Sequence, residues 1–222
     1  FSACSWGADQ THEWIKTSAA SMWRSTGDIF DTWESVKDLV KQQEKLHPYN
    51  GVGCFNDMDM LIVGMHGSGN VGIGGCTDEQ YLQHFAMWAF LGSPLIIGAD
   101  IRRLDDANKA TLLKKGLISI HQDPDCRPAF VIGKMEGQKY TLGKLLSHNR
   151  VAFAFFNVGT KDDWGQNMSI SFDDLGIHSE SGVGLKLTDA VTGEDYGVFY
   201  DGYHVKLAPD QCRILIGELV AA

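Results

Sequence analysis

One arginine and three aspartates lie in two short stretches of this chain and could share one chemical task. Arg24 and Asp28 are four residues apart, and Asp57 and Asp59 follow some thirty residues later. Hydrolysis of a glycosidic bond uses one carboxyl group to protonate the leaving oxygen and a second to attack, or to stabilise, an oxocarbenium-like centre. Acids on separate elements that face one cleft suit that chemistry, and we expect Asp28 to be the proton donor.

Asp28 also has a purely structural interpretation, because an aspartate before a helix usually caps its first N–H groups. Arg24 favours the chemical interpretation, since an arginine beside an acid at a strand end is costly to bury outside a polar cleft. In a parallel barrel the carboxyl ends of the strands form the active face, and we expect both residues to lie there.

Asp57 and Asp59 would share one face of an extended chain because they are two residues apart. A calcium-binding loop is the competing interpretation. Met58, Met60 and Leu61 offer no oxygen ligands at alternate positions, which argues against calcium. Only one of the two acids needs to face the cleft.

The elements that must position these residues alternate between short apolar runs and helical patterns from residue 1 to about 125. That alternation is typical of βα units with a parallel sheet. Thr77 and Gln80 predict a capping box at the start of one helix. We expect strands at residues 1–5, 20–24, 54–55 and 94–98, and helices at about 30–45, 78–91 and 106–115.

Beyond residue 126 strict alternation replaces the helical period. Val151, Phe153 and Phe155 alternate with smaller residues, as expected for a strand with one face on a core. Glycine-containing turn signals at 192–193 and 201–202 fall between such runs at a spacing typical of β-sandwiches. This part of the chain is predicted to be an antiparallel β domain.

The predicted fold class is α/β: the second half of a (β/α)₈ barrel at residues 1–125, followed by an antiparallel β-sandwich domain at residues 126–222. A closed barrel takes about 250 residues, and the first part has roughly half of that length. A four-strand parallel sheet would also leave open apolar edges. We therefore expect the chain to be the C-terminal portion of a longer polypeptide.

A glycine run at residues 67–72 matches the pattern GxGxxG and follows an apolar stretch. It raises a dinucleotide-binding alternative. In that fold the glycines open the helix that receives the pyrophosphate, whereas here the helix is expected to start only after Thr77. We interpret the run as a flexible active-site loop.

Composition excludes several classes of protein. The formal net charge of −9 argues against a nucleic-acid partner, because affinity for phosphate backbones comes from clustered Lys and Arg. No apolar run approaches the roughly 20 residues that span a bilayer. We expect a soluble chain, cytoplasmic or secreted, that has no membrane partner.

The five cysteines are widely spaced and form no CxxC pair, a pattern that predicts buried free thiols instead of a disulfide framework. The eight histidines show no HxxxH or HExxH spacing, so we expect no metal centre. We expect no other cofactor.

Four blocks occur in order along the chain: WRSTGDI at 23–29, NDMDML at 56–61, SPLIIGADIR at 93–102 and IHQDP at 120–124. Together they closely resemble the α-galactosidase and α-N-acetylgalactosaminidase family, glycoside hydrolase family 27. The resemblance by motif covers residues 1 to about 130, and beyond that it rests on the general character of a C-terminal β-sandwich. It implies that the first domain holds barrel strands five to eight.

The resemblance implies that Asp28 is the general acid/base and that Arg24 helps to hold the substituent at C2 of the sugar. Asp59 and Met60 correspond to a pair that lines the terminal-sugar pocket. Trp6 follows the first strand, and we expect it in the wall of the pocket.

The family retains anomeric configuration, so a second carboxylate acts as the nucleophile in a double displacement. Asp28 first protonates the leaving oxygen and then activates water as a base. In the family the nucleophile lies on the fourth barrel strand, which we expect upstream of this chain. The chain alone should therefore be inactive.

The sequence departs from the family pattern in two places. Cys54 and Phe55 stand where Gly and Trp are more common, and Met58 replaces a Pro. In the first strand, Ser5 and Ala8 occupy positions that in α-galactosidases commonly hold a Glu and a bulkier residue. Small residues resemble the N-acetylgalactosaminidase form of the pocket, although a bound water could fill the same space for galactose.

We therefore expect a retaining exo-glycosidase that removes terminal α-linked D-galactose, with α-N-acetylgalactosaminidase activity as the second candidate. The expected partners are a terminal α-galactoside or α-GalNAc glycan and the N-terminal barrel half that carries the nucleophile. A candidate of another class is a non-catalytic carbohydrate-binding or interaction module that keeps the half-barrel and the sandwich without the nucleophile strand.

Overall fold

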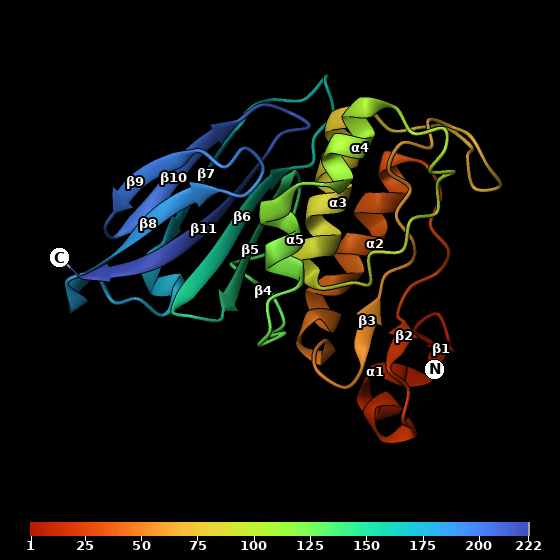
Figure 1. Ribbon diagram of the computed structural model, residues 1–222, viewed down its shortest axis with the longest axis horizontal. Coiled ribbons are helices and arrows are strands. Elements are labelled where there is room, and N and C mark those ends of the chain that lie inside the picture. The colour runs from red at the N-terminus through yellow and green to blue at the C-terminus, as the bar shows by residue number, and fades with distance from the viewer. Residues whose placement is uncertain (222) are drawn as a thin grey trace. The chain divides into compact units, whose positions relative to one another are not determined.

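The computed structural model describes residues 1–221 and divides into two compact units, residues 1–113 and 114–222. The first unit combines helices with short parallel strands, and the second is built mainly of antiparallel strands (Figure 1). The α/β class and the sandwich are as predicted. The domain limits 1–125 and 126–222 stay a prediction.

The first unit is organised around a parallel sheet in the order β1-β2-β3. Its strands are β1 (Ser2–Cys4), β2 (Met22–Arg24) and β3 (Phe55–Asp57). The register pairs Cys4 with Arg24 and Arg24 with Asp57. All three strands therefore end at the same edge, and the residues that follow them meet there.

The fourth strand predicted at residues 94–98 is not formed. A single parallel bridge joins Leu61 to Ile97, with Leu61 N donating to Ile96 O at 2.7 Å and Gly98 N to Leu61 O at 2.8 Å. Pro94 has no N–H to donate to a ladder, and the pairing does not extend beyond this bridge.

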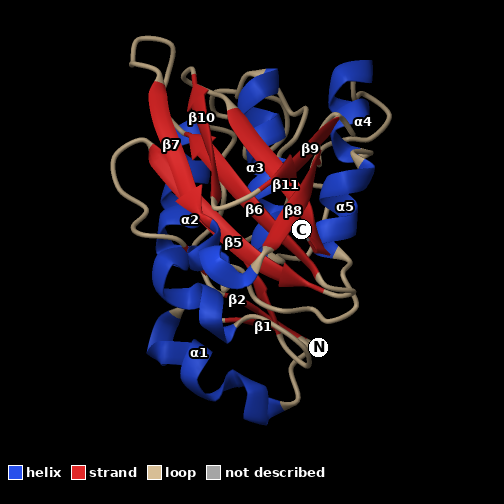
Figure 2. Cartoon of the chain, turned by 90° about the vertical axis from the view of Figure 1, so that its left-hand side faces the viewer, coloured by secondary structure: helices blue, strands red, loops and turns tan. Residues whose placement is uncertain are grey.

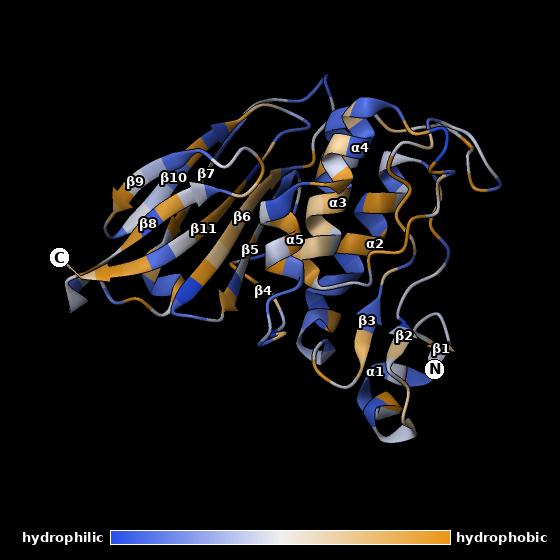
Figure 3. Ribbon diagram, in the orientation of Figure 1, coloured by the Kyte–Doolittle hydropathy of each residue, from blue (hydrophilic) through white to orange (hydrophobic). Residues whose placement is uncertain are grey.

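Helices complete the first unit. Thr32 caps α2 (Trp33–Leu46) by accepting from Ser35 N, and the predicted capping box of Thr77 and Gln80 is confirmed at α3 (Asp78–Leu91). In Figure 3, α2 alternates hydrophilic and hydrophobic positions, whereas α3 is mostly apolar. Eleven residues of α3 are buried, as expected for a central helix. The shorter helices are α1 (Thr11–Trp14), α4 (Asp106–Leu112) and the 3₁₀ turns η1 (Ala8–Gln10), η2 (Ile15–Ser18) and η3 (His47–Tyr49).

The helix predicted at 106–115 ends earlier than expected. Leu113 leaves the helical region with φ −102° and ψ 12°, and Lys114 is extended with φ −64° and ψ 101°. A new helix, α5 (Lys115–His121), then opens the second unit. The periodic pattern continued across a break that the sequence does not mark with Gly or Pro.

The second unit contains a six-stranded sheet in the order β4-β5-β6-β11-β8-β9 and a two-stranded ladder of β10 with β7, all antiparallel (Figure 2). Short 3₁₀ turns, η4 (Phe172–Leu175) and η5 (Ser179–Ser181), lie between strands. The strands are β4 (Phe130–Val131), β5 (Lys139–Leu146), β6 (Arg150–Asn157), β7 (Gln166–Ser171), β8 (Val183–Asp189), β9 (Asp195–Phe199), β10 (Gly202–Leu207) and β11 (Cys212–Ala221).

The core of the second unit gathers Phe153, Phe155 and Phe172 with aliphatic residues from several strands. The expectation that β6 buries one face only is wrong, because Ala152, Ala154 and Phe156 are fully buried as well. Alternation with small residues such as Ala152 and Ala154 suggested that this face is exposed, but small side chains also suit close packing.

All five cysteines are free thiols. Cys54 and Cys76 are buried as predicted, whereas Cys4 is exposed and the other two are half-buried. Among residues 1–221 no helix is both long enough and apolar enough to cross a bilayer.

Candidate active site

Arg24 ends β2 and connects two carboxylates. Its Nη2 lies 3.1 Å from Asp28 Oδ1 and 3.1 Å from Asp59 Oδ2, and it donates to the carbonyl oxygens of Thr26 and Gly27. The side chains of Arg24 and Asp59 are only 12% and 15% exposed, whereas that of Asp28 is 55% exposed. The guanidinium therefore fixes one partly buried acid and one acid that remains open to solvent.

Asp59 is held from every side. Its Oδ2 accepts from Ile29 N at 2.8 Å, its Oδ1 accepts from Met60 N at 2.7 Å, and its carbonyl accepts from Trp88 Nε1 at 2.7 Å. The backbone of Asp59 has φ +86°, a left-handed conformation that is unfavourable for residues other than glycine. Such strain persists where the surroundings over-determine the geometry, which is common at functional sites.

Asp57 has a different position from Asp59. It is buried, and its Oδ1 accepts from Asp59 N at 2.9 Å. Burial raises the pKa of Asp57, although the Asp59 N–H and the Arg24 charge act in the opposite direction. Of the two acids, Asp59 therefore pairs with Arg24, and Asp57 orients the backbone of Asp59 through its hydrogen bond.

Buried amides fix the ends of the strands. Asn56 Nδ2 donates to Gln43 Oε1 at 2.6 Å, and Asn56 N donates to Asn50 Oδ1 at 2.8 Å. Asn50 Nδ2 donates to Leu91 O at 2.6 Å. A buried hydrogen-bonded network of this kind favours one arrangement, because breaking any of these bonds leaves a buried polar group unpaired. Asn56 Oδ1 itself has no hydrogen-bond partner among residues 1–221. The network ties β3 to α2 and to the end of α3.

The structure rules out the capping interpretation of Asp28. Helix α2 begins only at Trp33 and is capped by Thr32. The contact of the Asp28 side chain is with Arg24. The carboxyl group is thus presented at the strand ends without a role in holding a helix.

The turn after β1 brings Ser5 and Ala8 next to β2. Gly7 N donates to Arg24 O at 3.2 Å, and Thr11 Oγ1 donates to Ser5 Oγ at 2.8 Å. Gly7 has φ +76°, and a Cβ there would collide with the carbonyl oxygen of Ser25. Only glycine allows this close approach of the two strands.

Trp6 is 59% exposed and has φ +53°. It lines a cavity of about 640 Å³ together with His12 and with Lys41 and Lys45 of α2. The structure therefore places the indole beside α2. Its place in the wall of the sugar pocket stays a prediction.

The glycine-rich loop after β3 is anchored at both ends by Asp31 and Tyr81. Gly67 N donates to Asp31 Oδ2 at 2.7 Å, Tyr81 Oη donates to Asp31 Oδ1 at 2.8 Å, and His66 N and Cys76 N donate to Tyr81 Oη. Burial, together with the Asp31 carboxylate, raises the pKa of Tyr81, which keeps the phenol protonated.

The glycines of residues 67–72 form turns, and the next helix begins at Asp78. The geometry that a dinucleotide site requires is therefore not present at this run. The loop instead lines a cavity of about 430 Å³, to which His66, Asn70, Asp100 and Arg103 contribute. Gly98, at its margin, lies directly against the Met60 side chain.

The structure joins Arg24, Asp28 and Asp59 in direct contact, and Met60 follows Asp59 against Gly98. One contributor has no signal in the sequence. Trp88 is fully buried, and its indole N–H positions Asp59. A lone buried tryptophan in a helix carries no signal for such a contact.

Two parts of the chain match models of known protein domains. Residues 3–123 match the family model described as alpha galactosidase A, and residues 136–216 match that of the alpha galactosidase C-terminal beta sandwich domain. Alpha-galactosidase 2 of Arabidopsis thaliana is 33% identical over 84% of this chain and 44% of its own length. The alpha-galactosidase of Cyamopsis tetragonoloba is 32% identical over 82% of this chain and 41% of its own length.

The fold is also that of known structures. Alpha-galactosidase I from Mortierella vinacea superposes with a TM-score of 0.81 at 23% identity, over 100% of this chain and 59% of that one. The chain spans less than half the length of the two curated relatives. The match of a family model to more than half of the chain establishes that it belongs to the α-galactosidase family, glycoside hydrolase family 27.

Proposed function

We propose that the polypeptide containing this chain is a retaining exo-glycosidase that hydrolyses terminal α-linked D-galactose. The observation that carries the proposal is the contact of Arg24 with both Asp28 and Asp59 at the carboxyl ends of two adjacent parallel strands. The carboxyl ends of barrel strands are where active sites of this fold are built. The alpha-galactosidases among the relatives support the same activity.

In the proposed mechanism Asp28 is the general acid/base. Its carboxyl group is the exposed member of the cluster and is free to approach the leaving oxygen. It protonates that oxygen in the first step and removes a proton from water in the second. Arg24 orients Asp28 and contacts the C2 substituent, and Asp59 and Met60 line the pocket of the terminal sugar.

The nucleophile of a retaining enzyme is a second carboxylate about 5–5.5 Å from the acid/base. The curated relatives are more than twice as long as the stretch that this chain matches. We propose that the nucleophile belongs to a part of the polypeptide outside that stretch. It attacks the anomeric carbon while Asp28 donates its proton to the departing aglycone.

A terminal α-N-acetylgalactosamine is the second candidate substrate. Ser5 and Ala8 are small, and the Ser5 hydroxyl is engaged by Thr11 Oγ1. Small residues at these positions leave room for an acetamido group at C2. In the galactose case we propose that water occupies that space.

The test is the hydrolysis of p-nitrophenyl α-galactoside and p-nitrophenyl α-N-acetylgalactosaminide by the complete polypeptide. We expect cleavage of the galactoside and compare wild type with Ser5→Glu, using Ser2→Glu on the exposed part of β1 as the matched control. If Ser5 sets specificity, Ser5→Glu reduces only the rate with the acetamido sugar. Absence of cleavage of both substrates by a folded protein would favour the non-catalytic carbohydrate-binding module.

A further inference from the structure

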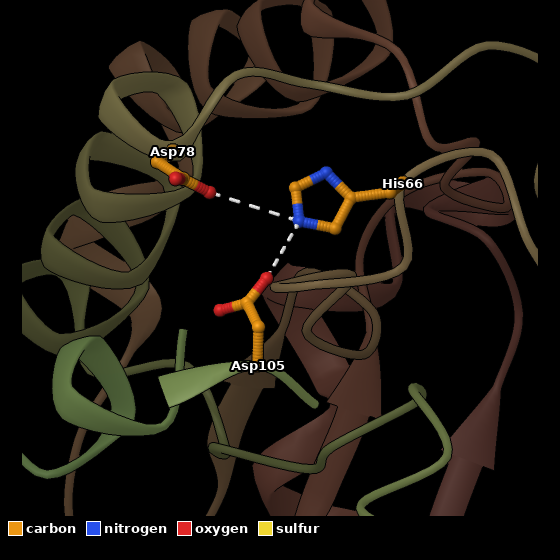
Figure 4. A group of neighbouring side chains, drawn as sticks. All are labelled: His66, Asp78 and Asp105. Carbon is orange, nitrogen blue, oxygen red and sulfur yellow. Dashed lines mark hydrogen bonds and ion pairs between the residues drawn. The ribbon is translucent and has the colours of Figure 1, made fainter. Parts of the chain in front are cut away.

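Three side chains from separate segments meet near the glycine-rich loop. His66 belongs to that loop, Asp78 is the first residue of α3, and Asp105 precedes α4 (Figure 4). His66 Nε2 lies 3.2 Å from Asp105 Oδ2 and 3.7 Å from Asp78 Oδ1. The three donor atoms lie within 4.8 Å of one another, and both carboxylates point at the same imidazole nitrogen.

Asn108 closes this cluster from the protein interior. Asn108 is 1% exposed, and its Nδ2 lies 3.1 Å from His66 Nε2, 2.9 Å from Asp78 Oδ1 and 3.0 Å from each oxygen of Asp105. An amide nitrogen has two hydrogens, so it cannot bond all four of these atoms at once. The backbone N–H of Asn108 also donates to Asp105 Oδ1 at 2.8 Å.

The other end of the same amide is unsatisfied. Asn108 Oδ1 is buried and has no hydrogen-bond partner within residues 1–221. A buried polar atom without a partner costs about 1–3 kcal/mol and calls for an explanation such as an ion. Rotation of the amide by 180° would place Oδ1 where Nδ2 now lies, among the two carboxylates and the imidazole.

We propose that His66, Asp78, Asp105 and Asn108 form a binding site for a divalent transition-metal ion of the zinc type. One imidazole nitrogen and two carboxylates are ligands that zinc accepts, and two carboxylates balance the charge of the ion. Zinc binds such atoms at about 2.0–2.2 Å, so tetrahedral neighbours lie roughly 3.3–3.6 Å apart. The two measured separations, 3.2 and 3.7 Å, bracket that range.

The fourth ligand is Asn108 Oδ1 after the amide has turned. A cation reverses the preference of the amide, because it attracts the carbonyl oxygen that the carboxylates alone repel. The ligands stand at 66, 78, 105 and 108, and only one of them is a histidine. This is why the histidine spacing predicted no metal centre.

Bound metal would fasten three segments that otherwise meet through the side chains of His66 and Asn108. It would tie the glycine-rich loop to the N-termini of α3 and α4, and so fix the His66 wall of the 430 Å³ cavity. The role is structural, and the proposal stands independently of the proposed glycosidase activity.

The test uses the complete polypeptide, stripped with chelator and titrated with zinc. We expect uptake of one zinc equivalent and a rise in Tm of several degrees. His66→Gln, Asp78→Asn and Asp105→Asn each weaken zinc binding at least tenfold. Asp105→Asn keeps an N-cap residue, and Asp106→Asn, a fully exposed neighbour outside the cluster, leaves binding unchanged.

The variant Asn108→Asp distinguishes two roles of residue 108, that of a metal ligand and that of a hydrogen-bond donor. Without zinc it replaces a donor by a third carboxylate, so Tm falls below that of wild type. With zinc it supplies a good ligand, and Tm returns to at least the wild-type value. Cobalt in place of zinc should also give the visible absorption of a tetrahedral site.

The proposal is overturned if the stripped wild-type protein takes up no zinc, or if His66→Gln takes it up as tightly as wild type does. It is equally overturned if zinc lowers the Tm of Asn108→Asp further. The wild-type titration and the cobalt spectrum need no variant. They test the proposal even if one of the variants fails to fold.

Discussion

The two units bury polar side chains very differently. Of the nineteen buried polar or charged residues in the described chain, fourteen lie in residues 1–113 and five in residues 114–221. The strands of the first unit that surround the candidate site have three residues each, whereas β5, β6 and β11 of the second have eight to ten. Short strands contribute few backbone hydrogen bonds, so side chains must fix their ends.

The difference shows what each unit is built for. In the first unit the network of Gln43, Asn50 and Asn56 and the strained backbone of Asp59 hold acids at defined positions. In the second unit a core of aromatic rings, Phe153 and Phe155 among them, provides stability with little polar chemistry. Changes in the first unit should alter activity more than stability, and changes in the second should do the reverse.

Arg24→Met should have the largest effect. It removes the cation shared by Asp28 and Asp59 and leaves the partly buried Asp59 without its charge partner. We expect kcat/KM of the complete polypeptide to fall at least 100-fold. Steady-state kinetics on p-nitrophenyl α-galactoside measures this, with Arg127→Met, an exposed arginine of the second unit, as the control that keeps full activity.

Phe153→Ala should have the largest effect on stability. Loss of a fully buried phenylalanine costs about 3–5 kcal/mol, measured as the change in free energy of unfolding in urea. Val198→Ala, at an exposed position in β9, should change it little. Below the unfolding transition kcat should stay within twofold of wild type, and a larger fall would break the division of roles between the units.

Trp88→Phe tests the contribution of a single hydrogen bond in the first unit. The ring remains in the core, but the donor to Asp59 O is lost, and a buried acceptor left unpaired costs about 1–3 kcal/mol. We expect kcat/KM to fall about 10-fold and the far-ultraviolet circular dichroism to remain unchanged. Trp164→Phe, at an 86% exposed site in the second unit, should leave kinetics as they are.

The smallest effects concern the pH dependence of stability. The stability of the two units should change in different pH ranges. Burial lowers the pKa of His84 in α3 to about 3, against about 6.5 in an unfolded chain. The unfolded state therefore binds the proton first, and stability falls as pH drops from about 6.5 toward 3. His84→Gln, which keeps an acceptor for Ile62 N, should flatten that slope.

Asp123 should act at lower pH. Burial alone would raise its pKa, but hydrogen bonds from Ser147 and the charge of Arg150 hold the pKa below its usual value. Its contribution to stability is present above about pH 3.9 and is lost as pH falls through the folded-state pKa. Urea midpoints measured from neutral pH downward should show both windows, with the lower one reduced in Asp123→Asn.

Much of the local structure could be predicted from the sequence. The strand–helix alternation and the capping box at Thr77 are local signals, and the fold class followed from them. The strand expected at 94–98 forms only one bridge. Strand pairing depends on the adjacent segment, which the local sequence pattern does not describe. The position of β11 between β6 and β8 is a tertiary fact that no local pattern carries.

The candidate site was predictable in part for the same reason. Arg24 and Asp28 belong to one short segment at a strand end, so the sequence could place them near each other. The contacts of Asp59 with Trp88 and of Asp31 with Tyr81 span 29 and 50 residues, and single residues of these types are common in cores. The cluster at His66 was missed because its members come from three segments.

Asp28 is assigned as the acid/base of a retaining enzyme, and Asp28→Asn in the complete polypeptide tests this assignment. General acid–base catalysis contributes about 10²–10⁴-fold, so kcat should fall by that factor while Tm stays within about 2 °C, because the side chain is 55% exposed. Azide attacks a glycosyl-enzyme intermediate without needing a base, so it should restore turnover of p-nitrophenyl α-galactoside and yield α-galactosyl azide. An unchanged rate, or a lost rate that azide cannot restore, would contradict the assignment.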